Sequence, residues 1–170
     1  MKKTGLLIYS SKTGNTKKLA ETVHSKLSGF CDFSDIDHAP DPGKYSWIII
    51  GFWVDRGTAD KKTLNLLNKI KNKPIVCIGT LGASPESEHA VKVRQTIAEI
   101  AGKENEYLGC FLCQGKISQE LIQKFEQLPP GNPHSVTEEK RKRYEEAAKH
   151  PNDADFEACH IFCRKVLNLI

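Results

Sequence analysis

The chain alternates short apolar clusters with segments in which apolar residues return every three or four positions. This alternation is typical of βα units, in which each strand is followed by an amphipathic helix. The most apolar cluster, at 47–52, shows no alternation between apolar and polar residues. Such a run predicts a strand whose two faces are both covered by helices.

The same pattern predicts five strands and six helices along the chain. We expect the strands at 5–9, 31–36, 47–52, 74–80 and 107–113. We expect the helices at 15–28, 60–72, 85–101, 118–128, 138–149 and 153–169. Strands that alternate with covering helices predict an α/β fold, here a three-layer sandwich around a five-stranded parallel sheet.

The length of 170 residues predicts a single domain spanning 1–170, because domains typically hold ~100–200 residues. The segment 129–150 departs from the alternation. It opens on the chain-breaking run Pro129 to Pro133. The stretch from Ser135 to Glu138 then resembles a capping box that opens a polar helix. We expect this segment to be an insertion into the domain.

Charge and composition exclude two classes of partner. The net charge of +4 is mild, and the basic residues are not interleaved with aromatic ones, so we expect no nucleic-acid partner. The basic run 140–143 is flanked by glutamates, and ion pairs along a solvated helix explain it. Because no apolar run reaches the ~20 residues of a membrane-spanning helix, we expect no membrane partner.

The amino-terminal residues and the cysteines indicate a compartment. The apolar stretch that follows Lys2 and Lys3 is too short for a signal peptide and is interrupted at Ser10. Without export, the six cysteines are expected to be reduced thiols in a cytoplasmic protein.

The loop between the first strand and the first helix is rich in hydroxyl groups. It contains Ser10, Ser11, Lys12, Thr13, Gly14, Asn15 and Thr16. Backbone N–H groups at the start of a helix form a partly positive concavity, and hydroxyl groups complete the hydrogen bonds to a phosphate. Neither a Walker loop nor a G-x-G-x-x-G motif is present here. The alternative is a turn that only caps the helix.

The stretch from Ser11 to Thr16 resembles the phosphate loop of the flavodoxin family, hydroxyl-x-Thr-Gly-Asn-Thr directly after the first strand. The resemblance covers 4–128 and the last helix. It implies the sheet order 2-1-3-4-5 and FMN as the cofactor. It also implies that the 5′-phosphate is held by the side chains of Ser11, Thr13, Asn15 and Thr16 and by the amides of Lys12 and Gly14. The stretches 51–60 and 111–116 further resemble a subgroup of small flavodoxin-like proteins from anaerobic bacteria.

Two further loops are expected to contact the flavin ring. The resemblance places Trp53 against the isoalloxazine, where an indole buries a large flat face. Gly57 takes a positive φ easily, so its carbonyl can turn toward the ring. The alternatives are a core tryptophan and an ordinary turn glycine. The cofactor-binding residues expected in these loops are Phe52, Trp53, Val54, Asp55, Arg56 and Gly57, followed by Thr80, Leu81, Gly82 and Ala83.

The segment after the fourth predicted strand departs from the flavodoxin pattern, because it supplies no aromatic residue to cover the second face of the ring. The charge departs as well, since typical flavodoxins are acidic around the flavin. Between Asp55 and Lys73 the basic residues outnumber the acidic ones. We put forward the hypothesis that this basic rim, which includes Arg56 and Lys61, recruits an acidic partner; the alternative is a solvated helix face.

The cysteines and histidines are not expected to bind metal. Cys110 and Cys113 have C-x-x-C spacing, but residues three apart on a strand point to opposite faces. Cys159 and Cys163 fall on the apolar stripe of the last helix. We interpret these four as core thiols, with zinc or an iron–sulfur cluster as the weaker alternative. The histidines show no paired spacing.

Two functions fit this pattern. The first is an FMN-binding electron carrier that shuttles electrons to a redox partner protein, with no side chain acting as a catalytic acid or base. The second is an FMN-dependent NAD(P)H oxidoreductase that acts on a quinone or another small acceptor. One domain leaves little sequence for a nicotinamide site, which favours the carrier. A receiver module is disfavoured, because Ser10 and Ser11 stand where it needs carboxylates.

Overall fold

The computed structural model describes residues 4–169 and contains a parallel sheet at its centre. The parallel strands lie in the order β2-β1-β3-β5-β6. Their bounds are β1 Gly5–Tyr9, β2 Cys31–Asp35, β3 Trp47–Asp55, β5 Pro74–Leu81 and β6 Glu106–Gln114. These are the five strands of the sequence prediction, in the predicted order, so the flavodoxin-like α/β sandwich is confirmed.

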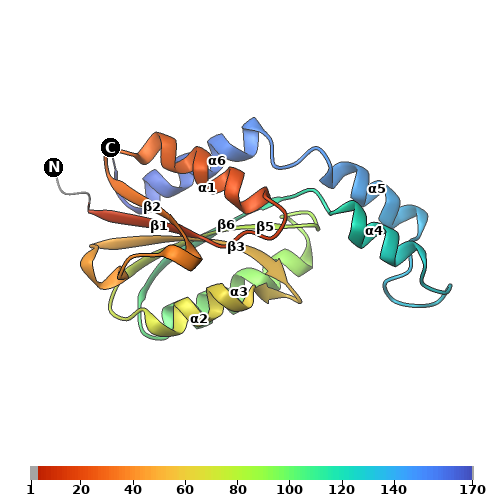
Figure 1. Cartoon of the computed structure of the whole chain (residues 1–170), viewed down its shortest axis with the longest axis horizontal. Helices are drawn as coiled ribbons and strands as arrows, with labels where there is room; N and C mark the ends of the chain where they lie inside the picture. Colours follow the sequence, from red (N-terminus) through yellow and green to blue (C-terminus); the bar gives the residue numbers. More distant parts are fainter. Residues whose placement is uncertain (1–3, 170) are drawn as a thin grey trace.

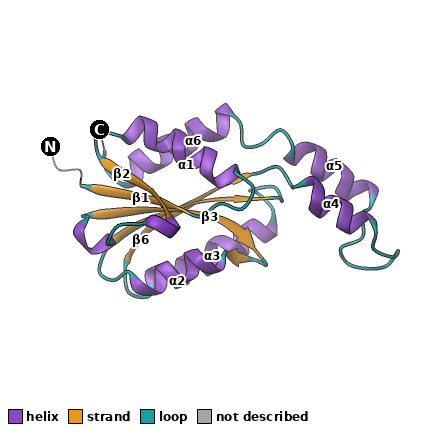
Figure 2. Cartoon of the chain, in the orientation of Figure 1, coloured by secondary structure: helices purple, strands orange, loops and turns teal. Residues whose placement is uncertain are grey.

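Helices cover both faces of the sheet (Figures 1 and 2). α1 (Asn15–Leu27) and α6 (Asp153–Val166) lie side by side on one face. α2 (Lys61–Lys69) and α3 (Glu88–Gly102) lie on the other. Two short 3-10 turns, Ile36–His38 and Pro42–Lys44, connect β2 to β3.

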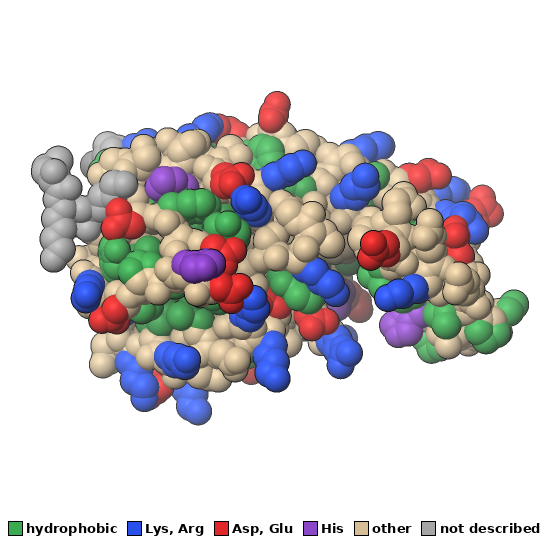
Figure 3. All heavy atoms as spheres, viewed as in Figure 1, with side chains coloured by type: hydrophobic (Ala, Val, Ile, Leu, Met, Phe, Trp, Pro, Cys, Tyr) green, Lys and Arg blue, Asp and Glu red, His purple; other side chains and the backbone are tan. Residues whose placement is uncertain are grey.

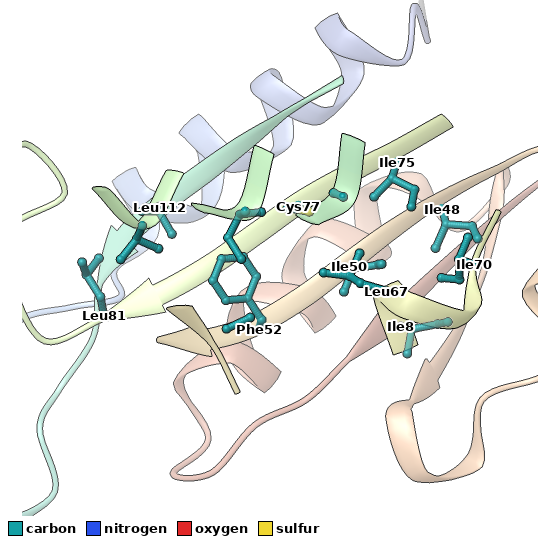
Figure 4. Close-up of a cluster of buried hydrophobic side chains, with 14 of the residues drawn as sticks. Ile8, Ile48, Ile50, Phe52, Leu67, Ile70, Ile75, Cys77, Leu81 and Leu112 are labelled. Carbon is teal, nitrogen blue, oxygen red and sulfur yellow. The ribbon is translucent and has the colours of Figure 1, made fainter. Parts of the chain in front are cut away.

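The apolar run of β3 fills the cores on both sides of the sheet. Ile48 and Ile50 belong to the cluster beneath α2 and α3, and Ile49, between them, belongs to the cluster beneath α1 and α6. Figure 4 shows Ile50 and Phe52 within the first of these clusters. Because neighbouring residues of a strand point to opposite faces, a strand buried on both sides needs the uninterrupted apolar run seen in the sequence.

β3 is longer than its apolar run predicts. It continues to Asp55, turns at Arg56 and Gly57, and pairs antiparallel with β4 (Thr58–Ala59). Both turn residues have positive φ, 51° and 83°. This is the backbone combination of a tight hairpin turn that follows the twist of the strands. The segment expected to be an open loop is therefore a hairpin, which adds a sixth strand to the sheet.

The helix that follows β6 does not cover the sheet, although the sequence places it among the covering helices. α4 (Gln119–Glu126) has no buried residue and extends away from the sandwich beside α5 (Glu138–Ala147), as Figure 1 shows. An ion pair joins Arg141 to Glu126 across the two helices (3.2 Å). The excursion from the sandwich thus includes α4 in addition to the predicted segment 129–150.

The base of this excursion is closed by the backbone. The amide of Lys116 donates a hydrogen bond to the carbonyl oxygen of His150 (2.9 Å). The segment that leaves the sandwich and the segment that returns to it therefore meet there. We call residues 117–149 the helical insertion. Among the residues described, 4–169, no helix is long and apolar enough to cross a membrane.

Candidate functional site

A cavity of about 590 Å³ opens at the carboxyl edge of the parallel strands. Three of its walls are loops that the sequence singles out: the one after β1, the β3–β4 hairpin and the end of β5. The fourth wall is the start of the helical insertion. Its lining residues are Ser11, Lys12, Thr13, Asn15, Thr16, Trp53, Val54, Asp55, Arg56, Thr80, Leu81, Gly82, Gly115, Lys116, Ile117, Ser118, Glu120, Leu121, Lys124 and Phe125.

The loop after β1 leaves the start of α1 without a side-chain cap. Gly14, the N-cap residue, has φ 98° and ψ −9°, a left-handed conformation that glycine adopts without strain. Its amide donates to Ser11 Oγ (3.1 Å), and this bond closes the loop. Among the α-helices described, the other five have an N-cap side chain that accepts a backbone hydrogen bond; these are Asp60, Ser87, Ser118, Thr137 and Asn152. The first-turn amides of α1 are thus placed to donate hydrogen bonds to a bound anion, which would cap the helix.

Thr16 holds this loop against the sheet. Its hydroxyl group donates to the carbonyl oxygen of Phe52 (3.2 Å) and lies 2.9 Å from Thr80 Oγ1. The side chain is almost fully buried. A threonine hydroxyl has one proton to donate, so the predicted phosphate contact of Thr16 requires the bond to Phe52 to be given up.

Ser10 is also engaged within the protein. Its hydroxyl group donates to Asp60 Oδ1 (2.8 Å), and both residues are buried. Asp60 in turn accepts bonds from the amide and the hydroxyl group of Thr63 and so caps α2. Ser10 therefore joins the end of β1 to the start of α2 and does not line the cavity.

Trp53 lies half-buried on the β3–β4 hairpin and lines the cavity. The ammonium group of Lys12 lies over its ring, 5.2 Å from the centroid. A cation at this distance is attracted to the electron-rich face of the indole. The contact joins the loop after β1 to the hairpin across the cavity wall.

The remaining wall is one that sequence reasoning missed. Asn15 Nδ2 donates to the carbonyl oxygen of Lys116 (2.9 Å) and joins the start of α1 to the segment after β6. From there Ile117, Leu121 and Phe125 line the cavity. Leu121 and Phe125, four residues apart, share one face of α4, and Ile117 directly precedes the N-cap residue of that helix. That spacing was visible in the sequence, but it is equally typical of a helix packed on the sheet.

A smaller hollow of about 370 Å³ adjoins the main cavity and shares Val54, Arg56, Leu81, Gly82 and Ile117 with it. Its remaining lining residues are Gly57, Ala83, His89 and Arg143. The structure thus gathers most of the predicted residues around the main cavity and puts Gly57 and Ala83 in the second hollow. Ser10, Gly14 and Phe52 line neither, and Phe52 lies in the core.

The basic residues of α2 and of the segment that follows it do not surround the cavity. Lys62 pairs with Asp37 (2.6 Å), and Lys71 pairs with Glu104 (2.9 Å). Figure 3 shows Lys and Arg side chains along the lower edge of the molecule, over α2 and α3. Of the proposed basic rim only Arg56 lines the cavity. The cations that do line it are Lys12, Arg56, Lys116 and Lys124, against the acidic Asp55 and Glu120.

The four cysteines that the sequence singles out, Cys110, Cys113, Cys159 and Cys163, are free thiols of the cores. Cys110 packs toward the α2–α3 side and Cys113 toward the α1–α6 side, as expected for residues three apart on a strand. Burial raises the pKa of Cys110 to about 12 and also raises the pKa of Cys113. Such thiols are poor nucleophiles and poor ligands. Across residues 4–169 no cluster of three or more His, Cys, Asp or Glu side chains is arranged to hold a metal ion.

Comparison with known proteins agrees with this architecture. The model of the flavodoxin domain matches residues 6–164. The flavodoxin-like domain-containing protein BilS of Clostridioides difficile (strain CD3) is 34% identical over an alignment 169 positions long, which covers 95% of each chain. Oxidised flavodoxin 1 from Bacillus cereus superposes with a TM-score of 0.59 at 15% identity and covers 98% of both chains. A flavoprotein from Lactobacillus acidophilus NCFM, solved in complex with FMN, superposes with a TM-score of 0.55 at 18% identity, over 65% of this chain and 93% of that one.

Proposed function

The chain belongs to the flavodoxin family, and on that premise we propose that it binds FMN in the 590 Å³ cavity and passes electrons to a redox partner protein. One observation carries the proposal. A single cavity runs from the uncapped start of α1 past Trp53 to the end of β5. Its size lies within the range of ~300–1,000 Å³ typical of cofactor sites.

The phosphate fits the loop after β1. Oriented backbone amides with a left-handed glycine between them form an anion-binding concavity, and the first turn of α1 has this form. Ser11 and Thr13 line the cavity beside it. The amide of Lys12 and the hydroxyl groups of Ser11 and Thr13 would hold the 5′-phosphate. The amide of Gly14 would join them only by giving up its bond to Ser11 Oγ. Thr16 and Asn15 then act chiefly by fixing the loop, through their bonds to Phe52 and Lys116.

The flavin ring fits the apolar part of the cavity. Trp53 offers a flat aromatic face, and Leu81 and Val54 add aliphatic surface. The ring has no aromatic partner at the end of β5. α4 supplies apolar side chains in the same cavity, from Leu121 and Phe125. These groups would exclude water from the ring on the side where the loop after β5 does not.

Bound FMN supplies the electron-transfer chemistry, while the protein sets its binding, orientation and electrostatics. The four cations that line the cavity outnumber the two carboxylates. Positive charge near a site favours an added negative charge there. These side chains would therefore stabilise the more negative form of whatever the cavity holds. No lining side chain is proposed as an acid or base.

We prefer the carrier to the NAD(P)H oxidoreductase, and we place it in the cytoplasm with its thiols reduced. Both functions need FMN, so the difference lies in the electron donor. Anaerobic mixing of the flavin-loaded protein with NADH and NADPH separates them. Prompt bleaching of the flavin absorbance supports the oxidoreductase, and no bleaching supports the carrier.

Titration of the flavin-free protein with FMN tests the proposal directly. We expect binding of one FMN per chain, quenching of tryptophan fluorescence, and a structured visible absorption band. Riboflavin, which lacks the phosphate, should bind at least about tenfold more weakly, because the charge-assisted hydrogen bonds of the phosphate are lost. Equal affinity for FMN and riboflavin contradicts the assignment of the loop after β1. Failure to bind either one contradicts the function.

A further inference from the structure

The smaller hollow beside the main cavity is built by parts of the chain that are distant in the sequence. Arg56 comes from the β3–β4 hairpin, His89 from α3 and Arg143 from α5 of the helical insertion. Ile117, at the start of the insertion, packs onto the end of β5, where a Cβ built on Gly82 would stand 3.0 Å from Ile117 Cδ1. On the other side of the hollow, Gly57 of the hairpin lies beside His89, since a Cβ on Gly57 would stand 3.9 Å from His89 Cε1. The hollow therefore depends on the insertion for one of its walls.

The polar lining of this hollow is cationic. Arg56 and Arg143 are two guanidinium groups with fixed donors, and His89 adds an imidazole. No Asp or Glu side chain is among its lining residues. Arg56 has one acidic neighbour, Asp55, at 4.0 Å. The guanidinium group of Arg143 lies over the ring of Tyr144, 5.7 Å from its centroid. Among the described residues, no carboxylate lies within ion-pair distance of Arg143.

We propose that this hollow binds the anionic group, a carboxylate or a phosphate, of a small molecule that lies beside the cofactor of the main cavity. Arginine recognises both groups through paired N–H donors, and the five shared lining residues place the ligand in direct continuity with the cofactor cavity. The inference rests on the proposed function and adds to it a second binding site and the charge of its ligand. It also gives the helical insertion a role, which is to place Arg143 in the wall of the smaller hollow.

A small molecule suits this site better than an acidic protein segment. The hollow has a volume of about 370 Å³, within the ~300–1,000 Å³ typical of small-molecule sites. The acidic residues Glu145 and Glu146 follow Arg143 on α5. They would repel an extended polyanion that runs along α5, whereas a compact anion inside the hollow contacts only the lining residues, none of which is acidic.

The test is calorimetric titration of the FMN-loaded protein with redox-inert probes. The anionic probes are benzene-1,3-dicarboxylate and adenosine 5′-phosphate, and benzene-1,3-dicarboxamide is the neutral control. The variants are Arg143→Ala and Arg56→Ala. Lys142→Ala is the matched control, because it removes one exposed positive charge from the adjacent position of α5 and lines neither hollow. Flavin absorbance checks the loading of every variant.

We expect an anionic probe to bind more tightly than the neutral one. Arg143→Ala should weaken its binding about tenfold, as expected for the loss of a charge-assisted hydrogen bond, and Lys142→Ala should not. Preference for the dicarboxylate or for the nucleotide identifies a carboxylate or a phosphate as the ligand group. Equal binding of neutral and anionic probes overturns the inference, as do equal effects of Arg143→Ala and Lys142→Ala. It is also overturned if only a hexaglutamate peptide binds in an Arg143-dependent manner.

The same titrations with flavin-free protein separate the two proposals. Arg143-dependent anion binding by a protein that takes up no FMN contradicts the proposed function but leaves the anion site standing. FMN uptake without Arg143-dependent anion binding contradicts the anion site but leaves the proposed function standing.

Discussion

The side chain of Asn15 donates a hydrogen bond to the backbone oxygen of Lys116, 2.9 Å away. This bond joins the first turn of α1 to the base of the helical insertion, although the two residues are 101 positions apart in the sequence. Gly115 permits the contact, because a Cβ at that position would stand 2.7 Å from Asn15 Nδ2. The relationship ties the proposed phosphate loop to the wall that sequence reasoning missed.

Asn15→Ala and Gly115→Ala should both disturb the contact between Asn15 and the segment at Lys116. The first removes the hydrogen bond, worth about 1 kcal/mol, and the second displaces the Asn15 side chain. We expect both to weaken FMN binding, and the double variant to be no weaker than the worse single one, because both changes act on one contact. FMN titration measures this. Gly29→Ala is the control, since nothing lies within 4 Å of a Cβ there. Additive effects in the double variant would contradict the view that both substitutions act through one contact.

The two tryptophans of the chain should separate binding from folding. Trp53→Ala should weaken FMN binding about tenfold or more, because the ring loses its aromatic contact, while the flavin-free protein keeps its melting temperature. Trp47 is buried, and its ring covers Gly5. Trp47→Phe should therefore lower the melting temperature with little effect on FMN affinity. Fluorescence titration and thermal unfolding measure the two quantities. A large stability loss in Trp53→Ala would instead make Trp53 a core residue.

Leu121 should contribute to ring binding through α4. It lines the cavity and is 41% exposed, so a ring bound in the cavity would bury it further. Leu121→Ala should weaken binding of FMN and riboflavin by the same factor, roughly fivefold, because it removes apolar contact and leaves the phosphate contacts intact. Ile161→Ala, at an exposed aliphatic residue of α6, is the control. An effect on FMN alone would place Leu121 at the phosphate end.

Gly79 should tolerate no side chain. A Cβ there would stand 2.6 Å from Phe52 Cζ and 2.8 Å from Leu112 Cδ2, both within the packed core. Gly79→Ala should lower the free energy of unfolding by about 1–3 kcal/mol through overpacking. Urea denaturation measures the change, again with Gly29→Ala for comparison. An unchanged midpoint would mean that Phe52 moves aside without cost.

The stability contributed by His150 should depend on pH. Its hydrogen bond with Asp155 (2.6 Å) is the main cause that raises the pKa of His150 above its usual value near 6.5. A raised pKa in the folded state stabilises the protein below pH ~6.5, and this contribution is lost as the pH rises through the folded-state pKa. His150→Gln should therefore be less stable than the parent at pH 5.5 and closer to it at pH 9. Urea denaturation at the two pH values measures the difference. A constant difference would show that the pair does not titrate.

The layers of the fold and the loop after β1 could be predicted from local patterns in the sequence. The bounds of β1 and the start of α1 at Asn15 follow from local patterns, because strand and helix periodicities and the turn residues between them lie within a few positions of one another. The same is true of the core placement of Cys110 and Cys113. These features needed no knowledge of distant residues.

The position of α4 and its place in the cavity wall depend on contacts between distant parts of the chain. Its apolar spacing fits a helix packed on the sheet as well as one that lines a cavity, since periodicity shows which residues share a face but not what that face meets. The bond from Asn15 to Lys116 and the gathering of Arg56, His89 and Arg143 join residues far apart along the chain. Such contacts are set by how the strands bring their carboxyl ends together, which no local pattern records.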